Sequence, residues 1–288
     1  MKILITGCTG LIGGHVYKYL LNRGFDVHGT RFNTITDAQK KLFKVDLTSK
    51  EESNSHLSQI NPDIIIHAAA VLPNSYNSEE SAIAASKNQL IDKYVIDYCQ
   101  KNSTRLVYIS SAHIYNREEA LPSLTESSPI FPEGSYLQQK YESEKRIRVA
   151  LKDYLILRVS SPFGGALKKG VIKIFIDKAL NNEDITLYGR GERIQDFISV
   201  KEIALIVEEL VLKNINGIYN VSSGEPVSMR QLALLVIEVT RSNSKLVFDE
   251  SKVELSLNNN FSNKKLLSVI DGVLKYDIRD GIVDIIKK

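Results

Sequence analysis

The sequence predicts an α/β protein that has a doubly wound parallel sheet and a smaller, mainly helical C-terminal lobe. Through the first half of the 288 residues, short apolar runs alternate with amphipathic segments of helical spacing, which is typical of parallel strands joined by crossover helices. After about Ser160 the connections lengthen and the apolar runs shorten. We therefore expect a sheet domain over residues 1–160 and a separate lobe over residues 161–288, part of which can return to the sheet.

The apolar runs of the first half are short and continuous, as expected for strands buried on both faces. We predict strands at Lys2–Thr6, Asp26–Thr30, Leu42–Val45, Asp63–His67, Arg105–Ser110 and Tyr154–Val159. Helical spacing predicts helices at Leu11–Asn22, Glu80–Lys101 and Tyr136–Leu151. In the second half, helical stretches separate short elements at Ile185–Tyr188, Asp196–Val200 and Gly217–Val221.

Composition excludes several classes of protein. The 37 basic and 34 acidic residues give a net charge of +3, which argues against a nucleic-acid partner. The two cysteines, Cys8 and Cys99, cannot form a disulfide framework and lack metal-ligand spacing, so we expect no metal site. No apolar run approaches the roughly 18 residues of a membrane helix, and the first residues do not resemble a signal peptide. We expect a cytoplasmic protein without a membrane partner.

Three glycines follow the first predicted strand at intervals of three, in TGCTGLIG from Thr6 to Gly13. In a strand-to-helix turn, such glycines bring the backbone N–H groups and the helix N-terminus close to a pyrophosphate. This is the arrangement of a Rossmann-type dinucleotide site. The glycines alone leave an ordinary tight turn as the alternative.

Further motifs follow in order: Asp46 in VDLTS, His67 with three alanines, SSAHIY from Ser110, YLQQK from Tyr136, RVSSPFG from Arg158, and GRGERIQDFISVKE from Gly189. In order and spacing, the set resembles the extended short-chain dehydrogenases/reductases, that is, the NAD-dependent epimerase/dehydratase family, over nearly the whole chain. The resemblance implies an NAD(P)-binding Rossmann domain, a substrate-binding lobe, and an oxidoreductase that acts on a nucleotide sugar. It also implies that the helices at Glu80–Lys101 and Tyr136–Leu151 could form a homodimer interface.

The resemblance further implies which residues bind the cofactor. An acid at the end of the second strand would select NAD, but Arg31 stands at or next to that place, and no Asp or Glu occurs between Val27 and Thr36. Because a guanidinium can hold a 2′-phosphate, we expect NADP, with NAD as the alternative. The implied cofactor residues are Gly7, Thr9, Gly10, Leu11, Ile12, Gly13, Arg31, Asp46, Leu47, Ala68, Ala69, Ala70, Tyr136 and Lys140.

Tyr136 and Lys140 lie four residues apart and share a face of a predicted helix. A phenol has a pKa of about 10, and a neighbouring ammonium favours the phenolate. By the resemblance, Tyr136 is the general acid/base, Lys140 lowers its pKa, and Ser111 hydrogen-bonds the reacting oxygen. Each residue alone has a structural explanation, but the ordered trio favours catalysis.

Some positions depart from the family pattern. Ala112 and His113 replace the acidic pair of the dehydratases, which argues against elimination of water, although His113 could transfer a proton. Ser161 replaces an asparagine and Gln195 an arginine that contact the nucleotide diphosphate, and Arg193 could stand in for the latter. The implied substrate residues are Ser111, Ser161, Arg193, Gln195 and Arg230, with Lys168, Lys169 and Arg190 as further candidates.

The sequence therefore favours an NADPH-dependent reductase of a 4-keto nucleotide sugar, with Tyr136 as the proton donor. A 4-epimerase that retains NAD is the closest alternative. A reductase of non-sugar carbonyls, suggested by Ser161 and Gln195, is a further one, and so is a cofactor-binding sensor without turnover.

Overall fold

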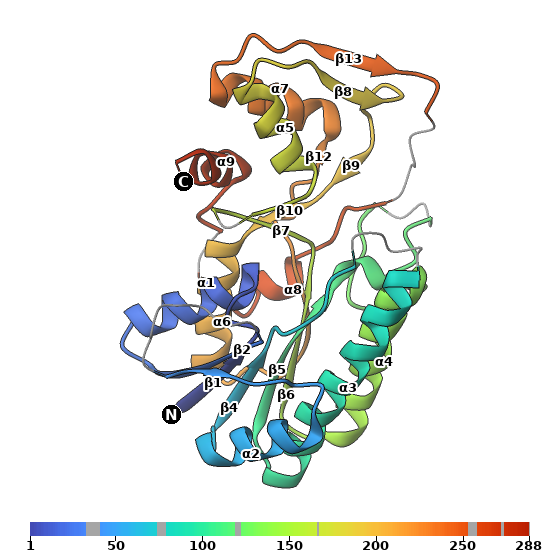
Figure 1. The fold of residues 1–288 in the computed structure, drawn as a ribbon. Coiled ribbons are helices and arrows are strands. Elements are labelled where there is room, and N and C mark those ends of the chain that lie inside the picture. Colours follow the sequence, from blue (N-terminus) through green and yellow to red (C-terminus); the bar gives the residue numbers. More distant parts are fainter. Residues whose placement is uncertain are drawn as a thin grey trace.

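The computed structural model describes residues 1–32, 41–73, 79–118, 122–165, 167–252, 258–271 and 274–287. Seven strands of the described chain form one parallel sheet in the order β11-β6-β5-β4-β1-β2-β3 (Figure 1). The strands are β1 (Lys2–Thr6), β2 (Asp26–Arg31), β3 (Leu42–Lys44), β4 (Ile64–His67), β5 (Arg105–Ser111), β6 (Tyr154–Val159) and β11 (Gly217–Val221).

Both faces of this sheet are covered by helices, which explains the continuous apolar strands. Ile3 and Ile5 of β1 pack into one hydrophobic core, whereas Leu4 between them packs into another. The first core includes side chains of α1 (Leu11–Asn22) and α6 (Val200–Leu212). The second includes side chains of α2 (Lys50–Ile60), α3 (Glu79–Asn102) and α4 (Gly134–Ala150). The predicted doubly wound parallel sheet is therefore confirmed.

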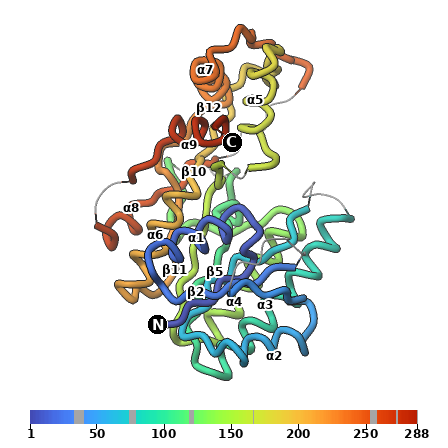
Figure 2. Tube along the Cα trace, turned by 60° about the vertical axis from the view of Figure 1, so that its left-hand side comes forward, coloured from blue at the N-terminus to red at the C-terminus, as the bar shows by residue number. Residues whose placement is uncertain are grey.

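The C-terminal part of the chain contributes to both the sheet and a smaller lobe. Strand β11 pairs in parallel with β6, so the chain returns to the sheet after residue 160. The lobe has its own hydrophobic core, built mainly by side chains of helices. Figure 2 shows these helices grouped above the sheet. Its elements and the connecting ones are β7 (Ser161–Phe163), α5 (Val171–Leu180), β8 (Ile185–Tyr188), β9 (Ile194–Gln195), β10 (Phe197–Ser199), β12 (Val227–Ser228), α7 (Met229–Thr240), β13 (Leu246–Asp249), α8 (Lys264–Leu267) and α9 (Ile278–Ile286).

Two short parallel pairs add to the lobe and its junction with the sheet. Strand β13 pairs with β8, and β10 pairs with β7 directly after β6 ends. The division at residue 160 stays a prediction. Within the described residues, no helix combines the length and the apolar character that crossing a membrane requires.

The sheet order places a crevice at the carboxyl ends of β1 and β4. These strands are neighbours, with Thr6 opposite His67. The helix after β1 covers one face of the sheet and the helix after β4 covers the other. In open α/β sheets, ligands bind in the crevice where the connections diverge in this way. The candidate site is therefore expected beside Thr6 and His67.

Candidate active site

The glycine loop is packed so closely that two of its positions require glycine. Gly7 has a φ of +72°, and a Cβ there would lie 2.7 Å from the Cα of Ala69. A Cβ on Gly13 would lie 2.5 Å from the carbonyl oxygen of Gly7. Gly10 is the N-cap of α1 and provides no side-chain cap, so the helix presents its first N–H groups beside the loop. Such a helix terminus suits an anion.

A pocket of about 410 Å³ opens beside this loop. Its wall includes the loop, the ends of β2 and β4, and part of α3. Nine of the predicted cofactor residues line it: Gly7, Thr9, Gly10, Arg31, Asp46, Leu47, Ala68, Ala69 and Ala70. The other predicted cofactor residues are not part of its lining: Leu11, Ile12, Gly13, Tyr136 and Lys140. Among the described residues, the wall also includes seven that were not predicted from the sequence: Thr30, Phe32, Val45, Thr48, Val71, Lys87 and Ile91.

The polar groups of the pocket fit a dinucleotide. The buried Oγ1 of Thr30 has no hydrogen-bond partner within the described residues. Among the lining residues that the structure describes, Arg31 and Lys87 are the bases and Asp46 is the acid. Asp46 accepts hydrogen bonds from the N–H and the hydroxyl of Thr48, at 2.9 and 2.7 Å, through the same carboxylate oxygen. The pocket therefore suits a ligand that carries anionic groups.

The Ser111, Tyr136 and Lys140 trio lies where β5 meets α4. Ser111 is the last residue of β5, and its hydroxyl accepts a 3.2 Å hydrogen bond from the N–H of His113. The short helix η1 (Ala112–Ile114) follows, and Ile114 packs against Tyr136. Both Tyr136 and Lys140 are buried, at 8% and 4% exposure. The Nζ of Lys140 donates a 3.0 Å hydrogen bond to the carbonyl oxygen of Ile109 on β5. The fold thus brings the strand end and the helix together.

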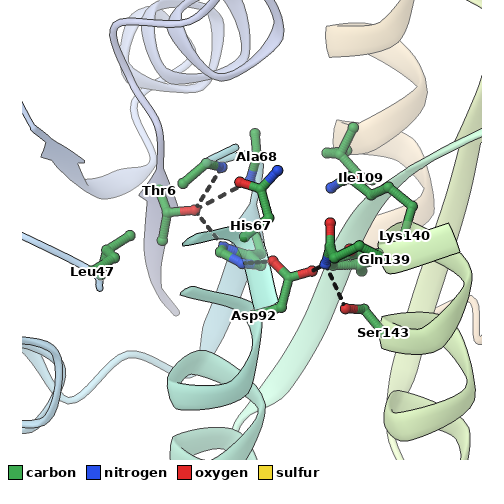
Figure 3. A network of polar contacts seen from close by, with 12 residues as sticks. Thr6, Leu47, His67, Ala68, Asp92, Ile109, Gln139, Lys140 and Ser143 are labelled. Atoms are coloured by element: carbon green, nitrogen blue, oxygen red, sulfur yellow. Dashed lines mark hydrogen bonds and ion pairs between the residues drawn. The ribbon is translucent and has the colours of Figure 1, made fainter. Parts of the chain in front are cut away.

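A buried polar network leads from the glycine loop to α4 (Figure 3). The hydroxyl of Thr6 lies 2.6 Å from Nδ1 of His67, and Nε2 of His67 lies 3.0 Å from the carboxylate of Asp92 on α3. That carboxylate also accepts from the side-chain amide of Gln139 at 2.7 Å. Asp92 was not among the residues predicted from the sequence. The sequence does carry a signal that could have indicated it, because Asp92 is an acid on the apolar face of a helix, between the buried Ile91 and Val95.

Of the predicted substrate residues, the structure joins Ser161 to Gln195. The Nε2 of Gln195 donates a 2.6 Å hydrogen bond to the hydroxyl of Ser161. Arg193 donates to the Sδ of Met229 at 3.2 Å, and Arg230 lies next along the chain at the start of α7. The guanidinium of Arg230 lies 5.8 Å from the ring centroid of Phe248.

His113 stands beside Ser111 and contacts the edge of Phe261, with ring centroids 5.5 Å apart. Burial lowers the pKa of His113 to about 3, and the positive charges of Arg117 and Arg193 act in the same direction. The imidazole is therefore neutral at physiological pH, and it supplies no imidazolium proton there. Within the described residues, no group of three or more His, Cys, Asp or Glu side chains could hold a metal ion.

Known proteins resemble this chain over most of its length. Residues 3–222 match the model of the NAD-dependent epimerase/dehydratase family. A protein of Methanocaldococcus jannaschii, provisionally assigned as a UDP-glucose 4-epimerase, is 26% identical over 275 residues, which cover 87% of this chain and 86% of that protein. The dTDP-glucose 4,6-dehydratase 1 of Escherichia coli is 25% identical over 77% of this chain and 72% of its own.

The fold is shared with solved structures of such enzymes. The UDP-glucose 4-epimerase of Thermus thermophilus, solved in complex with NAD, superposes with a TM-score of 0.86 at 24% identity. The match covers 100% of this chain and 98% of that one. On the family match over residues 3–222, this chain belongs to the NAD-dependent epimerase/dehydratase family.

Proposed function

We propose that the chain is an NADPH-dependent reductase of a 4-keto nucleotide sugar. The observation that carries the proposal is the pocket beside the glycine loop, where, among the described lining residues, Arg31 and Lys87 are the bases and Asp46 is the acid. A guanidinium or ammonium group there can bind a 2′-phosphate, whereas NAD selection needs an acid on the ribose hydroxyl. An enzyme that reduces a ketone consumes hydride, so it benefits from the reduced NADPH pool of the cell.

In this proposal Ser111, Tyr136 and Lys140 have separate roles. A nicotinamide cofactor, when bound, would supply the hydride. Tyr136 delivers the proton to the sugar oxygen, and the Lys140 ammonium favours the phenolate that remains. Ser111 donates a hydrogen bond to the same oxygen as its charge changes. In this proposal Lys140 also holds the nicotinamide ribose.

The nucleotide-sugar substrate is supported by the named activities of the relatives, an epimerase and a dehydratase of nucleotide-linked glucose. Elimination of water is not proposed, because Ala112 and His113 provide no carboxyl group next to Ser111. In the lobe, we propose that Ser161, Arg193, Gln195 and Arg230 contact the nucleotide diphosphate. A reductase of non-sugar carbonyls remains the alternative if these residues contact no phosphate.

A 4-epimerase that retains NAD is the second candidate. It is favoured by the resemblance to UDP-glucose 4-epimerases in sequence and in fold. An epimerase oxidises and re-reduces the same carbon, so its cofactor is not consumed. The two candidates therefore differ in one observable, the net oxidation of NADPH.

We also propose a homodimer through α3 and α4. These helices pack against each other, and they present exposed apolar side chains at Ile83, Leu90 and Val149, of which Val149 is 90% exposed. Sedimentation equilibrium of the wild type and of Val149→Glu tests this. A monomeric wild type would contradict it.

The test of function uses the purified protein, NADPH, and a panel of nucleotide-linked 4-keto and 4-hydroxy sugars, with the nicotinamide and the sugar followed in the same reaction. Oxidation of NADPH in step with loss of a keto sugar is expected. Inversion of a 4-hydroxy sugar without net NADPH oxidation would establish the epimerase. Tight NADPH binding with no reacting sugar would favour non-sugar carbonyls, or a sensor without turnover.

A further inference from the structure

Asp92 on α3 is a buried carboxylate that accepts a hydrogen bond from Gln139 on α4, the helix of Tyr136 and Lys140. The proposed chemistry does not use it. Its side chain is 2% exposed, and that of His67 beside it is fully buried. Among the described residues, three groups hydrogen-bond to the carboxylate: Nε2 of His67 at 3.0 Å, the hydroxyl of Tyr108 at 2.5 Å, and Nε2 of Gln139 at 2.7 Å. An acid is rarely buried so completely unless it is paired, because desolvating a carboxylate is costly.

The hydrogen-bond pattern fixes the protons on one side of Asp92. The hydroxyl oxygen of Thr6 accepts from the N–H groups of Ala68 and Ala69, at 3.2 and 3.1 Å, so its own proton is left to donate to Nδ1 of His67. A neutral His67 then carries its proton on Nε2 and donates it to Asp92. The chain of bonds therefore ends on a carboxylate that only accepts (Figure 3).

On the other side, Tyr108 connects Asp92 to Lys140. The Tyr108 hydroxyl donates to Asp92, and the Lys140 ammonium lies 4.5 Å from the centroid of the same ring. A hydrogen bond to a carboxylate makes the phenol ring more electron-rich, which strengthens its attraction for a cation. Gln139, adjacent to Lys140 on α4, adds a direct bond to Asp92.

The charges around Lys140 support the same connection between Asp92 and Lys140. The carboxylates that act on Lys140 are those of Asp92 and Glu144. Glu144 is already held by Arg158, whose Nη2 lies 2.6 Å and Nε 3.1 Å from its oxygens. Within the described residues, this leaves Asp92 as the carboxylate whose charge can balance Lys140.

The directions in which the pKa values of Lys140 and Asp92 are shifted agree with this geometry. Burial lowers the pKa of the Lys140 ammonium, and the charges of Asp92 and Glu144 oppose that shift. Burial acts to raise the pKa of Asp92, but the Lys140 charge and the His67 hydrogen bond outweigh it and hold that pKa below its usual range.

We propose that Asp92 is the counter-charge and positioning residue of Lys140, joined to it through Tyr108 and Gln139 and tied to the glycine loop through His67 and Thr6. The proposal rests on the proposed function in one respect, the role of Lys140 beside Tyr136. Asp92 touches no substrate in it. It keeps the buried ammonium charged, so that the ammonium can stabilise the phenolate that Tyr136 becomes when it gives up its proton.

Asp92→Asn is the first variant, since asparagine has the same shape. Its amide nitrogen would face Gln139. The buried Oε1 of Gln139 has no hydrogen-bond partner among the described residues, and the amide can turn so that this oxygen accepts from the new asparagine. Tyr108→Phe is the second variant, which keeps the ring over Lys140 and removes the bond to Asp92. Asp97→Asn is the matched control, because Asp97 lies on the same helix but pairs with Lys93 and Arg146 at the surface.

The readout is the titration of Lys140, followed by NMR in protein carrying ¹³C at the lysine ε-carbons and assigned with a Lys140→Met variant. In Asp92→Asn the titration midpoint is expected to fall by at least about one pH unit. Tyr108→Phe should give a smaller shift in the same direction, and Asp97→Asn none. A midpoint unchanged in both Asp92→Asn and Tyr108→Phe would overturn the proposal, even if the free energy of unfolding falls.

Because the NMR titration needs no substrate, it separates this proposal from the proposed function. In an active enzyme, the alkaline limb of kcat should move to lower pH together with the Lys140 midpoint. If the midpoint moves and no carbonyl substrate reacts, the role of Asp92 stands and the proposed function fails. If the alkaline limb moves in Asp92→Asn without the midpoint, the counter-charge role is wrong.

Discussion

Ser161 and Gln195 bind each other: the amide nitrogen of Gln195 lies 2.6 Å from the hydroxyl oxygen of Ser161. The backbone holds the same two segments together, since Ser161 pairs with Phe197 in the β7–β10 register and its N–H donates to the carbonyl oxygen of Asp196 at 3.3 Å. The two positions that depart from the family pattern in the lobe are therefore one coupled unit.

Because the two residues are coupled, the effects of Ser161→Ala and Gln195→Ala on the free energy of unfolding should not be additive. A hydrogen bond between neutral groups contributes about 0.5–1.5 kcal/mol, and a double-mutant cycle on the free energy of unfolding in urea should show an interaction energy of that size. Thr186→Ala, on the exposed face of β8, is the control and should add independently to Gln195→Ala. An interaction energy near zero for the Ser161 and Gln195 pair would contradict the coupling.

Tyr136→Phe should remove most of the activity and leave cofactor binding intact. General acid/base catalysis contributes about 10²–10⁴-fold, and the phenyl ring keeps the packing of Tyr136 against Ile114. The measurements are kcat with the reacting sugar and the dissociation constant for NADPH. Tyr141→Phe, which changes a half-buried tyrosine on the same helix, should keep wild-type kcat. Equal activity in both variants would mean that Tyr136 is not the acid/base.

Arg31→Ala should weaken NADPH binding and spare NADH. Loss of a charge-assisted hydrogen bond of about 1.5–3 kcal/mol corresponds to roughly a 10- to 150-fold rise in Kd. Both dissociation constants can be measured by fluorescence titration of the reduced nicotinamide. Lys44→Ala is the control, because Lys44 pairs with Arg31 in the β2–β3 register but is exposed and outside the pocket lining. A parallel loss of NADPH and NADH affinity in Arg31→Ala would argue against a 2′-phosphate contact.

The strands and most helices could be predicted because their apolar patterns are strong. Lys2–Thr6 and Tyr154–Val159 have the predicted bounds. Helix α2 was not among the predicted elements, since KEESNSHLSQI buries few apolar side chains. Its start is fixed instead by the hydroxyl of Ser49, which accepts from the N–H of Glu52.

The site was predictable where glycines and short motifs mark it, and less so where distant residues meet. The pocket lining includes Arg31 and Asp46, as the motifs indicate, but Lys87 belongs to it only because α3 passes the end of β4. Asp92 and His67 are 25 residues apart, and their contact depends on the packing of α3 on the sheet. No local pattern contains that information.

His113 should influence stability in acid without contributing an acidic limb to the rate. Its pKa is lowered to about 3 by burial and by Arg117 and Arg193, whereas the unfolded chain has an ordinary value of about 6.5. Between these values the unfolded state binds a proton that the folded state does not, so the free energy of unfolding contributed by His113 is complete above pH 6.5 and is lost as pH falls toward 3. His113→Gln removes this titration. Its free energy of unfolding, measured in urea at each pH, should fall less steeply than that of the wild type across this window. His56→Gln, on the exposed side of α2, should keep the wild-type slope.

The same variant tests whether His113 takes part in the reaction. Since the imidazole of His113 is already neutral above about pH 5, kcat between pH 5.5 and 7.5 should keep its wild-type pH dependence in His113→Gln. Loss of an acidic limb there would show that His113 transfers a proton after all.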